Sequence, residues 1–582
     1  MENFDLVIIG AGWFGLAAGK TALEINPSLN LVILDSAASI GGVWARERLY
    51  DELRTNNVVG SYEYSDFPMT EGQFGVQSDE HIPGKTVHAY LNAYAETFGI
   101  NHNTRLRCTV VSATYTPDKY WDVNVNVKAS VSSLRTPKLI IATGLTSQPI
   151  MPRFPGQDGF GAPLLHAKQL ATLDKTFLES NDITVSILGG TKSAWDAAYT
   201  CASKGAQVDW IIRESGHGPV WMAPARVTPL KLLLEKLPTT RALSWFSPCV
   251  WGASSLIRTF LHETWLGQKI VKGFWALLES DLLQCNDYDQ HPDTAKLRPW
   301  VNPFWVANSL SILNYPTDIF QLIRQERIRV HVADIDRLSA HTVHLSTGDR
   351  LRSDALICCT GWKPTPAITF SPAGIERDLG FPWAEDCLGR DRTLLEDSSA
   401  AILHNFPTLR DDQQPPHNPS LTPVCDEDED PSSAVLHPFR LARFLVPPNM
   451  FEDRSIVFLG VAMSFSTTVM AEIQSLWSMA YLFNGLTLSG KNSTDIWSET
   501  ALHTEFCRLR YPGGFGARHP DFVFDLMPYL DLLMTDLGLA TARKSSLWRN
   551  LFLPHGPADY RGLVGEWKAD VAATAVAARV WI

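Results

Sequence analysis

The chain has few of the features that mark secreted, metal-binding or membrane-spanning proteins. It has nine cysteines, an odd number, and none of them form a CxxC pair. This pattern excludes a disulfide framework or a zinc ribbon, so we expect reduced thiols and no metal site. No uncharged apolar run reaches the roughly 18 residues that a membrane-spanning helix needs. A first strand that begins at Phe4 leaves no room for a signal peptide, and we expect a cytoplasmic protein.

Basic charge is also scarce. The 50 lysines and arginines are outnumbered by 62 acidic residues, which gives a net charge of -12 and argues against a nucleic-acid partner. The composition is that of a globular protein, with 45% hydrophobic and 19% charged residues. A chain of 582 residues can hold two or three domains with a large core.

A glycine-rich turn near the N-terminus predicts a first dinucleotide site. It follows a β-branched run over 4–9, precedes an expected helix over 14–25, and its residues are Gly10, Ala11, Gly12, Trp13, Phe14 and Gly15. Gly10 permits the tight turn, Gly12 lets a pyrophosphate approach the backbone, and Gly15 lets the helix pack on the strand. Asp35 ends the next strand, where a carboxylate can accept from ribose hydroxyls. We include Phe14 among the predicted contacts.

A second glycine-rich turn follows the strand expected over 183–188. Its residues are Gly189, Gly190, Thr191, Lys192, Ser193 and Ala194. Thr191 stands where the pattern has its second glycine, and Lys192 and Ser193 could compensate with a charge and a hydroxyl. Arg213 ends the next strand and suits a 2′-phosphate, which favours NADPH over NADH, although Glu214 follows at once. Gly189, Thr191, Lys192, Ser193 and Arg213 are the predicted contacts.

These units predict an α/β fold with two Rossmann-like dinucleotide-binding domains, the second inserted into the first. The expected boundaries are 1–165 and 366–485 for the first domain, 166–365 for the second, and 486–582 for a C-terminal extension. A helical insertion is expected over about 225–314, a hairpin over 329–350, and an acidic loop over about 410–433. The insertion is rich in tryptophan and phenylalanine. Helix packing, a wall for a bulky apolar substrate, and a patch on a membrane surface are the three interpretations.

Further motifs lie between and after the two turns. They are Gly41-Gly42-Val43-Trp44, Leu53-Arg54-Thr55-Asn56 followed by Ser65-Asp66-Phe67-Pro68, Ala142-Thr143-Gly144, Phe160 to His166, Cys359-Thr360-Gly361-Trp362, and Phe458-Leu459-Gly460 with the helix from Ala471. Together they resemble the class B flavin monooxygenases, which include flavin-containing monooxygenases, the plant YUCCA enzymes and Baeyer–Villiger monooxygenases. Ala162 and Leu170 depart from the family's linker pattern.

The resemblance implies FAD at the first turn, NADPH at the second, and transfer of one oxygen atom from O2 to a small lipophilic substrate. The oxygen carrier would be a C4a-(hydro)peroxyflavin, and a specialised metabolite is the expected substrate. Asn56 is the expected catalytic residue beside the flavin, because an amide donates and accepts hydrogen bonds without titrating. Arg54 would add positive charge. The other implied cofactor contacts are Gly42, Trp44, Thr55, Val110, Ala142, Thr143, Gly144, Thr360, Gly361 and Gly460.

Three alternatives stay open at this point. Baeyer–Villiger oxygenation of a ketone to an ester or lactone is the nearest, although Leu170 stands where those enzymes normally carry tryptophan. A disulfide reductase shares the two-turn architecture, but Cys358 and Cys359 are adjacent on an expected strand and would face opposite sides. The third alternative is a flavoprotein that does not oxygenate, or an inactive scaffold. His166 either contacts the nicotinamide cofactor or braces the linker. The oligomeric state has no signal in the sequence.

Overall fold

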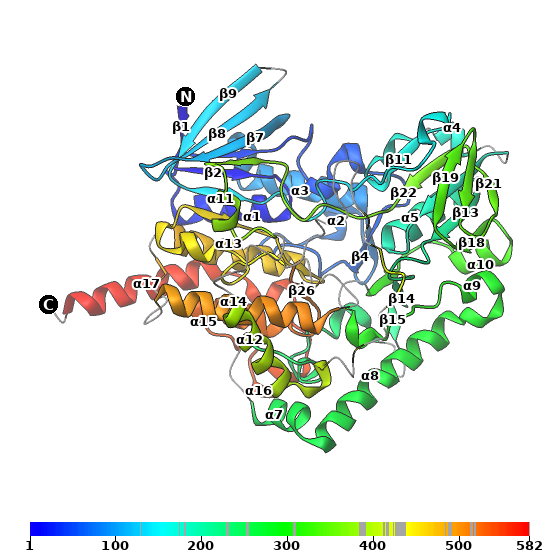
Figure 1. Cartoon of the computed structure of the whole chain (residues 1–582). Helices are drawn as coiled ribbons and strands as arrows, with labels where there is room; N and C mark the ends of the chain where they lie inside the picture. Colours follow the sequence, from blue (N-terminus) through cyan, green and yellow to red (C-terminus); the bar gives the residue numbers. More distant parts are fainter. Residues whose placement is uncertain are drawn as a thin grey trace.

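The computed structural model has three sheets of five strands with helices packed around and between them (Figure 1). It describes the chain except at 128–129, 174, 180–181, 228–231, 252–254, 307–309, 383–391, 411–413, 415–417, 423, 425–437, 484, 487–491, 513–515, 517–518 and 581–582. Along the described parts, no helix combines the length and the apolar character needed to cross a bilayer.

The first sheet is parallel and contains the strand that leads into the first glycine turn. Its order is β24 (Ile456–Phe458), β10 (Leu139–Ile141), β2 (Leu6–Ile9), β3 (Leu31–Leu34) and β6 (Thr104–Arg105). The residues of β2 and β3 are all buried, as expected for a parallel sheet covered on both faces. Helix α1 (Trp13–Ile25) follows β2 and packs against α13 (Thr467–Leu482).

The second sheet is also parallel and contains the strand that leads into the second turn. Its order is β11 (Leu164–His166), β22 (Ala355–Cys358), β12 (Thr184–Leu188), β13 (Gln207–Ile212) and β18 (Ile328–Val332). Helix α5 (Lys192–Ser203) connects β12 to β13 and α10 (Ile319–Arg324) precedes β18. Strand–helix–strand units of this kind are the predicted arrangement around both turns.

The third sheet covers the first and is mixed. Its order is β1 (Glu2–Asn3), β9 (Ser130–Thr136), β8 (Trp121–Val127), β7 (Cys108–Tyr115) and β23 (Thr369–Ser371). The pairing of β7, β8 and β9 is antiparallel, and a short parallel strand lies at each edge. Side chains of β7 and β8 share one apolar cluster with those of β2, β3 and β10. Helix α3 (Gly84–Thr97) and the short pair β4 (Arg54–Val58) and β5 (His81–Pro83) belong to the same N-terminal part of the chain.

Two linkers run beside each other between the two parallel sheets. Pro149 and Trp362 form an isolated antiparallel bridge, and the Lys363 amide donates to the Gln148 carbonyl over 2.9 Å. The Arg48 guanidinium lies over the Trp362 ring, with 5.4 Å to its centroid. The two linkers therefore form an antiparallel pair where they cross between the sheets.

The insertion is mostly helical, as expected, but it also contributes strands. Its helices are α6 (Arg241–Ser244), α7 (Leu256–Glu263), α8 (Trp265–Asn286) and α9 (Pro292–Ala295), and α8 follows one edge of the molecule in Figure 1. Strand β14 (Trp221–Pro224) pairs in parallel with β17 (Leu310–Leu313), and β15 (Arg226–Val227) pairs with β16 (Leu232–Leu233). The β14–β17 pair anchors both ends of the insertion.

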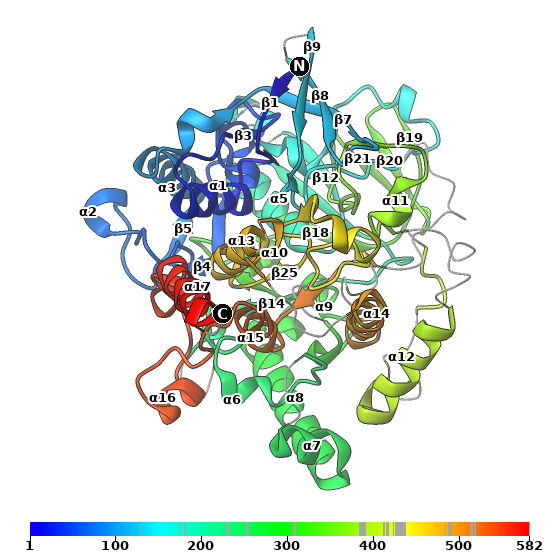
Figure 2. The same ribbon diagram turned by 90° about the vertical axis from the view of Figure 1, so that its left-hand side faces the viewer.

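The last ninety residues, which carry no readable motif, are helical. Their helices are α14 (Ser493–Arg510), α15 (Leu526–Asp536), α16 (Leu547–Phe552) and α17 (Leu563–Val580), and β26 (Asp521–Phe522) pairs with β25 (Met463–Ser464). Helices α15 and α17 pack against α13, and Figure 2 shows them on the same side of the molecule. Helix α12 (Arg392–Asn405) packs against α14, and α2 (Glu71–Phe74) and α11 (Ile375–Asp378) are short surface turns.

One predicted element is wrong in part, and one falls largely outside the described residues. The range 329–350 is not a single hairpin, because β18 joins the parallel sheet beside β13. The hairpin is β19 (Ile335–Ser339) with β20 (Thr342–Leu345), followed by β21 (Arg350–Arg352). An edge strand alternates apolar and polar residues just as a hairpin strand does, so the pattern could not separate them. The acidic loop over 410–433 lies mostly outside the described residues.

Glu472 on α13 is buried beside the loop that carries the SDFP motif. Its carboxylate accepts from the Ser65 amide over 3.1 Å and from the Ser65 hydroxyl over 2.8 Å. Burial is the main cause that raises the pKa of Glu472 to about 8, and Asp66 raises it further. Between the unfolded value of 4.5 and about 8, the folded chain holds a proton that the unfolded chain has lost. Stability from this group therefore falls as the pH rises through that window.

Glu472→Gln should remove this pH dependence, because the amide stays neutral. We expect the variant to be more stable than the parent above pH 8 by about 1–3 kcal/mol, and to differ little from it at pH 5. Thermal unfolding at both pH values measures the difference. Glu71→Gln, at an exposed position on α2, is the control. A constant difference at the two pH values would contradict the assignment.

Candidate functional site

Close backbone contacts make glycine necessary at two positions of the first turn. Gly10 has φ +114°, and a Cβ there would lie 2.3 Å from the Ala142 carbonyl oxygen. A Cβ on Gly15 would lie 1.8 Å from the Gly10 carbonyl oxygen. The turn is therefore held between β10 and the start of α1, as expected from the sequence. No side chain caps α1 at Gly12, so its first amides point out of the turn.

Gly42 and Asp35 form the wall opposite the turn. A Cβ on Gly42 would approach Gly12 Cα to 3.1 Å, so the two backbones face each other. The Asp35 carboxylate accepts from the Ala11 amide over 2.7 Å and from the Ala37 amide over 2.8 Å. Burial raises the pKa of Asp35. These bonds fix the carboxylate at the turn, and its remaining lone pairs can accept from a ligand hydroxyl.

The other residues assigned to the first turn lie on separate elements. Phe14 packs on Gly460 at the end of β24, where a Cβ would approach its ring to 2.6 Å. Trp44 is buried in the 3-10 turn Gly42–Trp44, and its indole donates to the Tyr62 hydroxyl over 3.2 Å. The Val110 side chain belongs to the core between the first and third sheets.

Strand β4 presents the predicted catalytic residues. The Thr55 hydroxyl accepts from the Ile82 amide over 2.9 Å, and Arg54 donates to the His81 carbonyl over 3.2 Å. The Asn56 amide donates to the Ser311 hydroxyl of β17 over 3.0 Å. Arg54 and Thr55 therefore hold β4 to β5, whereas Asn56 turns toward the insertion.

Asn314, just after β17, joins β4 to the second turn. Its amide donates to the carbonyls of Arg54 and Thr55 over 3.1 and 3.0 Å, and its oxygen accepts from Lys192 over 3.0 Å. Lys192 also pairs with Asp196 and lies 4.7 Å from the centroid of the Tyr315 ring. The structure thus joins β4 and the second turn in one hydrogen-bonded network.

The second turn begins with the same kind of close backbone contact as the first. Gly189 has φ +140°, and a Cβ would lie 2.6 Å from the Cys359 carbonyl oxygen; a Cβ on Gly190 would lie 2.5 Å from that of Gly218. Thr191 is the exposed N-cap of α5 and makes no side-chain cap. Ser193, in the first turn of α5, is half-buried. The first backbone amides of α5, like those of α1, therefore have no side-chain cap.

Arg213 follows β13 and is covered by a described part of the acidic stretch. Its guanidinium donates to the Thr422 carbonyl over 2.9 Å and to the Ser215 hydroxyl over 3.3 Å. The Asn418 side chain donates to the carbonyls of Glu214 and Gly216 over 2.8 and 2.9 Å. Residues 418–422 thus form one side of the space beside Arg213.

The two linkers end in the predicted Thr-Gly motifs. The Ala142 amide donates to the Ile9 carbonyl, and Thr143 and Gly144 follow at the surface of the first sheet. The Thr360 hydroxyl donates to the Ile150 carbonyl over 2.6 Å, and the Gly361 carbonyl accepts from the Ile150 amide over 3.1 Å. Both motifs therefore lie where the linkers meet the sheets.

His166 holds the second linker. Its Nε2 lies 3.1 Å from the Gly361 carbonyl, which identifies Nε2 as the donor, and its Nδ1 accepts from the Lys168 amide over 3.1 Å. Burial is the main cause that lowers the pKa of His166 to about 4, so the ring is neutral at pH 7. With both nitrogens engaged, the contacts match the bracing interpretation.

A buried glutamate that the sequence did not suggest lies behind β4. Glu235 accepts from the Val58 amide over 3.1 Å and from the Ser61 hydroxyl over 2.8 Å. Burial raises the pKa of Glu235 to about 7. Asn314, Ser311 and Glu235 all come from the insertion and contact β4 across more than 170 positions of sequence. No local motif marks them.

The two adjacent cysteines are not a redox pair. Cys358 and Cys359 are both free and buried, and burial raises the pKa of the Cys358 thiol to about 12. A reactive cysteine needs an accessible thiolate. The geometry therefore supports discounting disulfide reduction.

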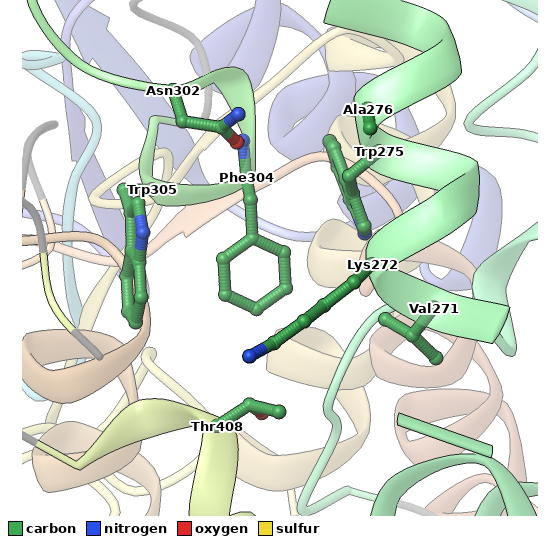
Figure 3. Close-up of a pocket in the computed structure, with 8 residues that line it drawn as sticks. All are labelled: Val271, Lys272, Trp275, Ala276, Asn302, Phe304, Trp305 and Thr408. Carbon is green, nitrogen blue, oxygen red and sulfur yellow. The ribbon is translucent and has the colours of Figure 1, made fainter. Parts of the chain in front are cut away.

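The aromatic insertion divides into core, cavity and surface. Trp251 is buried among Phe444, Phe506 and Phe522. A cavity of about 250 Å³ is lined by Val271, Lys272, Trp275, Ala276, Asn302, Phe304, Trp305 and Thr408. Figure 3 shows the Phe304 ring between Trp275 and Trp305, with the Lys272 side chain extending toward Thr408. Helix packing therefore accounts for Trp251, while Trp275, Phe304 and Trp305 border a cavity.

Comparison with known proteins agrees with this geometry. Residues 7–236 match the family model described as pyridine nucleotide-disulphide oxidoreductase. The chain is 31% identical to the FAD-dependent monooxygenase DEP4 of Alternaria brassicicola, over 98% of this chain and 95% of that protein. It is 33% identical to an FAD-dependent monooxygenase of Pyrenophora dematioidea, over 93% of this chain and 99% of that protein.

Solved structures share the fold at lower identity. The open crystal structure of cyclohexanone monooxygenase has a TM-score of 0.56 at 15% identity and covers 92% of this chain and 98% of its own. S-allyl-L-cysteine S-oxygenase from Allium sativum has a TM-score of 0.52 at 15% identity and covers 98% of this chain and 93% of its own. With relatives above 30% identity along nearly its whole length, the chain belongs to the class B FAD-dependent monooxygenases and is an oxidoreductase.

Proposed function

We propose that this monooxygenase uses FAD at the first glycine turn and NADPH at the second, and inserts one oxygen atom from O2 into a small lipophilic substrate. The observation that carries the proposal is the Asn314–Lys192 network, which connects Asn56 to the second turn. Bound FAD would supply the oxygen chemistry, through the C4a-(hydro)peroxyflavin that the family resemblance implies. The chain's own residues would position the cofactors and exclude water.

The residues around the first turn suit a flavin dinucleotide. Gly12 and Gly42 leave backbone without side chains where a pyrophosphate would approach, and the N-terminus of α1 favours negative charge. Asp35 would accept from the ribose. Phe14, Trp44, Thr55, Val110 and Gly460, with Ala142, Thr143 and Gly144, are the proposed further contacts. Asn56 and Arg54 would border the reacting end of the flavin.

The residues around the second turn suit NADPH. Gly189, Thr191 and Ser193 lie at the open N-terminus of α5, where phosphate would bind. Lys192 would then bring its charge from Asp196 toward the phosphate. Arg213 would contact the 2′-phosphate beside residues 418–422, and Thr360 and Gly361 would border the nicotinamide end. The boundaries 1–165 with 366–485, and 166–365, are the proposed FAD and NADPH domains.

An apolar substrate is favoured by the aromatic cavity. Trp275, Phe304 and Trp305 line it with few polar groups, as is usual for sites that take lipophilic molecules. Phe304 and Trp305 precede β17, the strand that holds Ser311 against Asn56. The relatives are named monooxygenases of fungi, which fits a specialised metabolite as substrate.

Oxygen uptake with product mass analysis tests the proposal. Purified protein should contain FAD, lose its yellow colour with NADPH, and consume O2 when a panel of lipophilic ketones, sulfides and phenols is supplied. A product heavier by one oxygen atom is expected. Ring expansion or ester formation would assign Baeyer–Villiger chemistry. Retained FAD with no oxygenated product from any substrate would favour the non-oxygenating flavoprotein.

Asn56→Ala should keep bound FAD but release peroxide instead of oxygenated product. The reason is that β4 stays in place through Thr55 and Arg54, while the amide beside the flavin is lost. We expect product per NADPH to fall about tenfold or more. The ratio of hydrogen peroxide to product measures this. Ser311→Ala, which removes only the partner of Asn56, should have a smaller effect. Unchanged coupling in Asn56→Ala would remove Asn56 from the catalytic residues.

Arg213→Ala should weaken the binding of NADPH much more than the binding of NADH. Loss of a charge-assisted contact to the 2′-phosphate is expected to raise the KM for NADPH about tenfold or more. Steady-state kinetics with both nucleotides measures the ratio. Asn418→Ala is the control, because it loosens residues 418–422 and leaves the guanidinium. An equal rise in KM for both nucleotides would show that Arg213 does not contact the 2′-phosphate.

A further inference from the structure

Large apolar side chains gather at one end of the molecule, away from both glycine turns. They come from α7 and the first half of α8, at the bottom of Figures 1 and 2, and from α16, which lies near α7 in Figure 1 and beside α6 at the left of Figure 2. We define the apolar end face as Leu256, Phe260, Trp265, Leu266, Leu547 and Trp548. Leu256 is 90% exposed, Trp265 74% and Trp548 61%.

Contacts through α6 hold the three helices in one arrangement. The Arg258 guanidinium of α7 donates to the Ser244 hydroxyl of α6 over 3.1 Å. At the other end of α6, the His555 amide donates to the Thr239 carbonyl over 3.0 Å, and His555 lies 3.1 Å from Asn550 of α16. The end face is therefore built on connected helices and not on a loose segment.

These helices already have a second side that packs into the protein. Leu261 of α7 and Val271 and Trp275 of α8 are buried in the main core. Gly267 lets the two helices approach, because a Cβ there would lie 1.9 Å from the Phe260 carbonyl oxygen. Since the inner side satisfies the packing of α7 and α8, the apolar side chains on the outer side are in excess of what folding needs.

The charges around the face favour a lipid surface. Lys269 and Lys272 on α8 and Arg549 on α16 are exposed, Lys272 also at the cavity, and these three bases outnumber the exposed Glu263 that ends α7. The acids Glu279 and Asp281 lie in the second half of α8. This basic rim belongs to a chain of net charge -12. Exposed tryptophan and leucine beside lysine and arginine is the pattern by which helices bind the headgroup region of anionic bilayers. A second copy of this acidic chain would offer the basic rim no specific partner such as the dense phosphates of a bilayer, so the rim would contribute less binding energy to a dimer.

We propose that the apolar end face docks the enzyme onto the surface of an anionic phospholipid membrane. The helices would lie in the interface without spanning the bilayer, and the basic rim would contact lipid phosphates and carboxylates. This proposal is independent of the proposed function, because it uses no cofactor contact.

Co-sedimentation of the full chain with vesicles tests it. The parent protein should bind vesicles of phosphatidylcholine with phosphatidylserine, and bind pure phosphatidylcholine less well. Leu256→Ser, Trp265→Ser and Trp548→Ser combined should weaken binding about tenfold or more. Lys269→Glu with Arg549→Glu should remove the preference for phosphatidylserine. Val131→Ser, at a β9 residue that is 70% exposed, is the matched control and should bind like the parent.

Three results would overturn the proposal. They are a parent protein that stays in the supernatant, a triple variant that binds like the parent, and self-association in place of lipid binding. Sedimentation velocity detects self-association. The parent would then form a dimer, the triple variant would be monomeric, and neither protein would bind vesicles. FAD content and thermal unfolding of each variant report whether the fold is intact.

Discussion

The arrangement of the site depends on the side-chain amide of Asn314. Its two N–H groups go to the carbonyls of Arg54 and Thr55, and its oxygen accepts from Lys192. Asn314 itself is buried. Because every group of this amide is used in a buried place, the separation between β4 and the second glycine turn has little freedom. Asn56 reaches its own partner, Ser311, from the same position.

The insertion is therefore part of the site and not an appendage. The pairing of β14 with β17 brings both ends of the insertion together and sets Ser311 and Asn314 against β4. Glu235 reaches the same strand from the start of the insertion. Phe304 and Trp305, which line the aromatic cavity, precede β17 in sequence, so the segment that positions Asn56 also contributes to the apolar lining. Substrate and cofactor positions would be linked through this one segment.

What could be predicted from the sequence was local. Gly10 and Gly15 follow from the close approaches of a strand–turn–helix unit, and Asp35 follows from its place at the end of the next strand. Asn314, Ser311 and Glu235 could not be found in this way, because each acts across a large sequence separation and none carries a motif. The alternation over 329–350 predicts a hairpin, whereas β18 is an edge strand of the parallel sheet, which has the same alternation. The contact of Thr422 with Arg213 depends on a polar stretch whose composition indicates only a loop.

The most direct test of this account is the rate at which NADPH bleaches the flavin of Asn314→Ala without oxygen. Loss of the amide should loosen β4 from Lys192, because Asn314 is the side chain that bonds to both of them. Stopped-flow absorbance should show full FAD content and bleaching slower by about tenfold or more, since misplacement of two reactants costs rate steeply. A bleaching rate equal to that of the parent, with FAD retained, would contradict the claim that Asn314 holds the two cofactor sites in register.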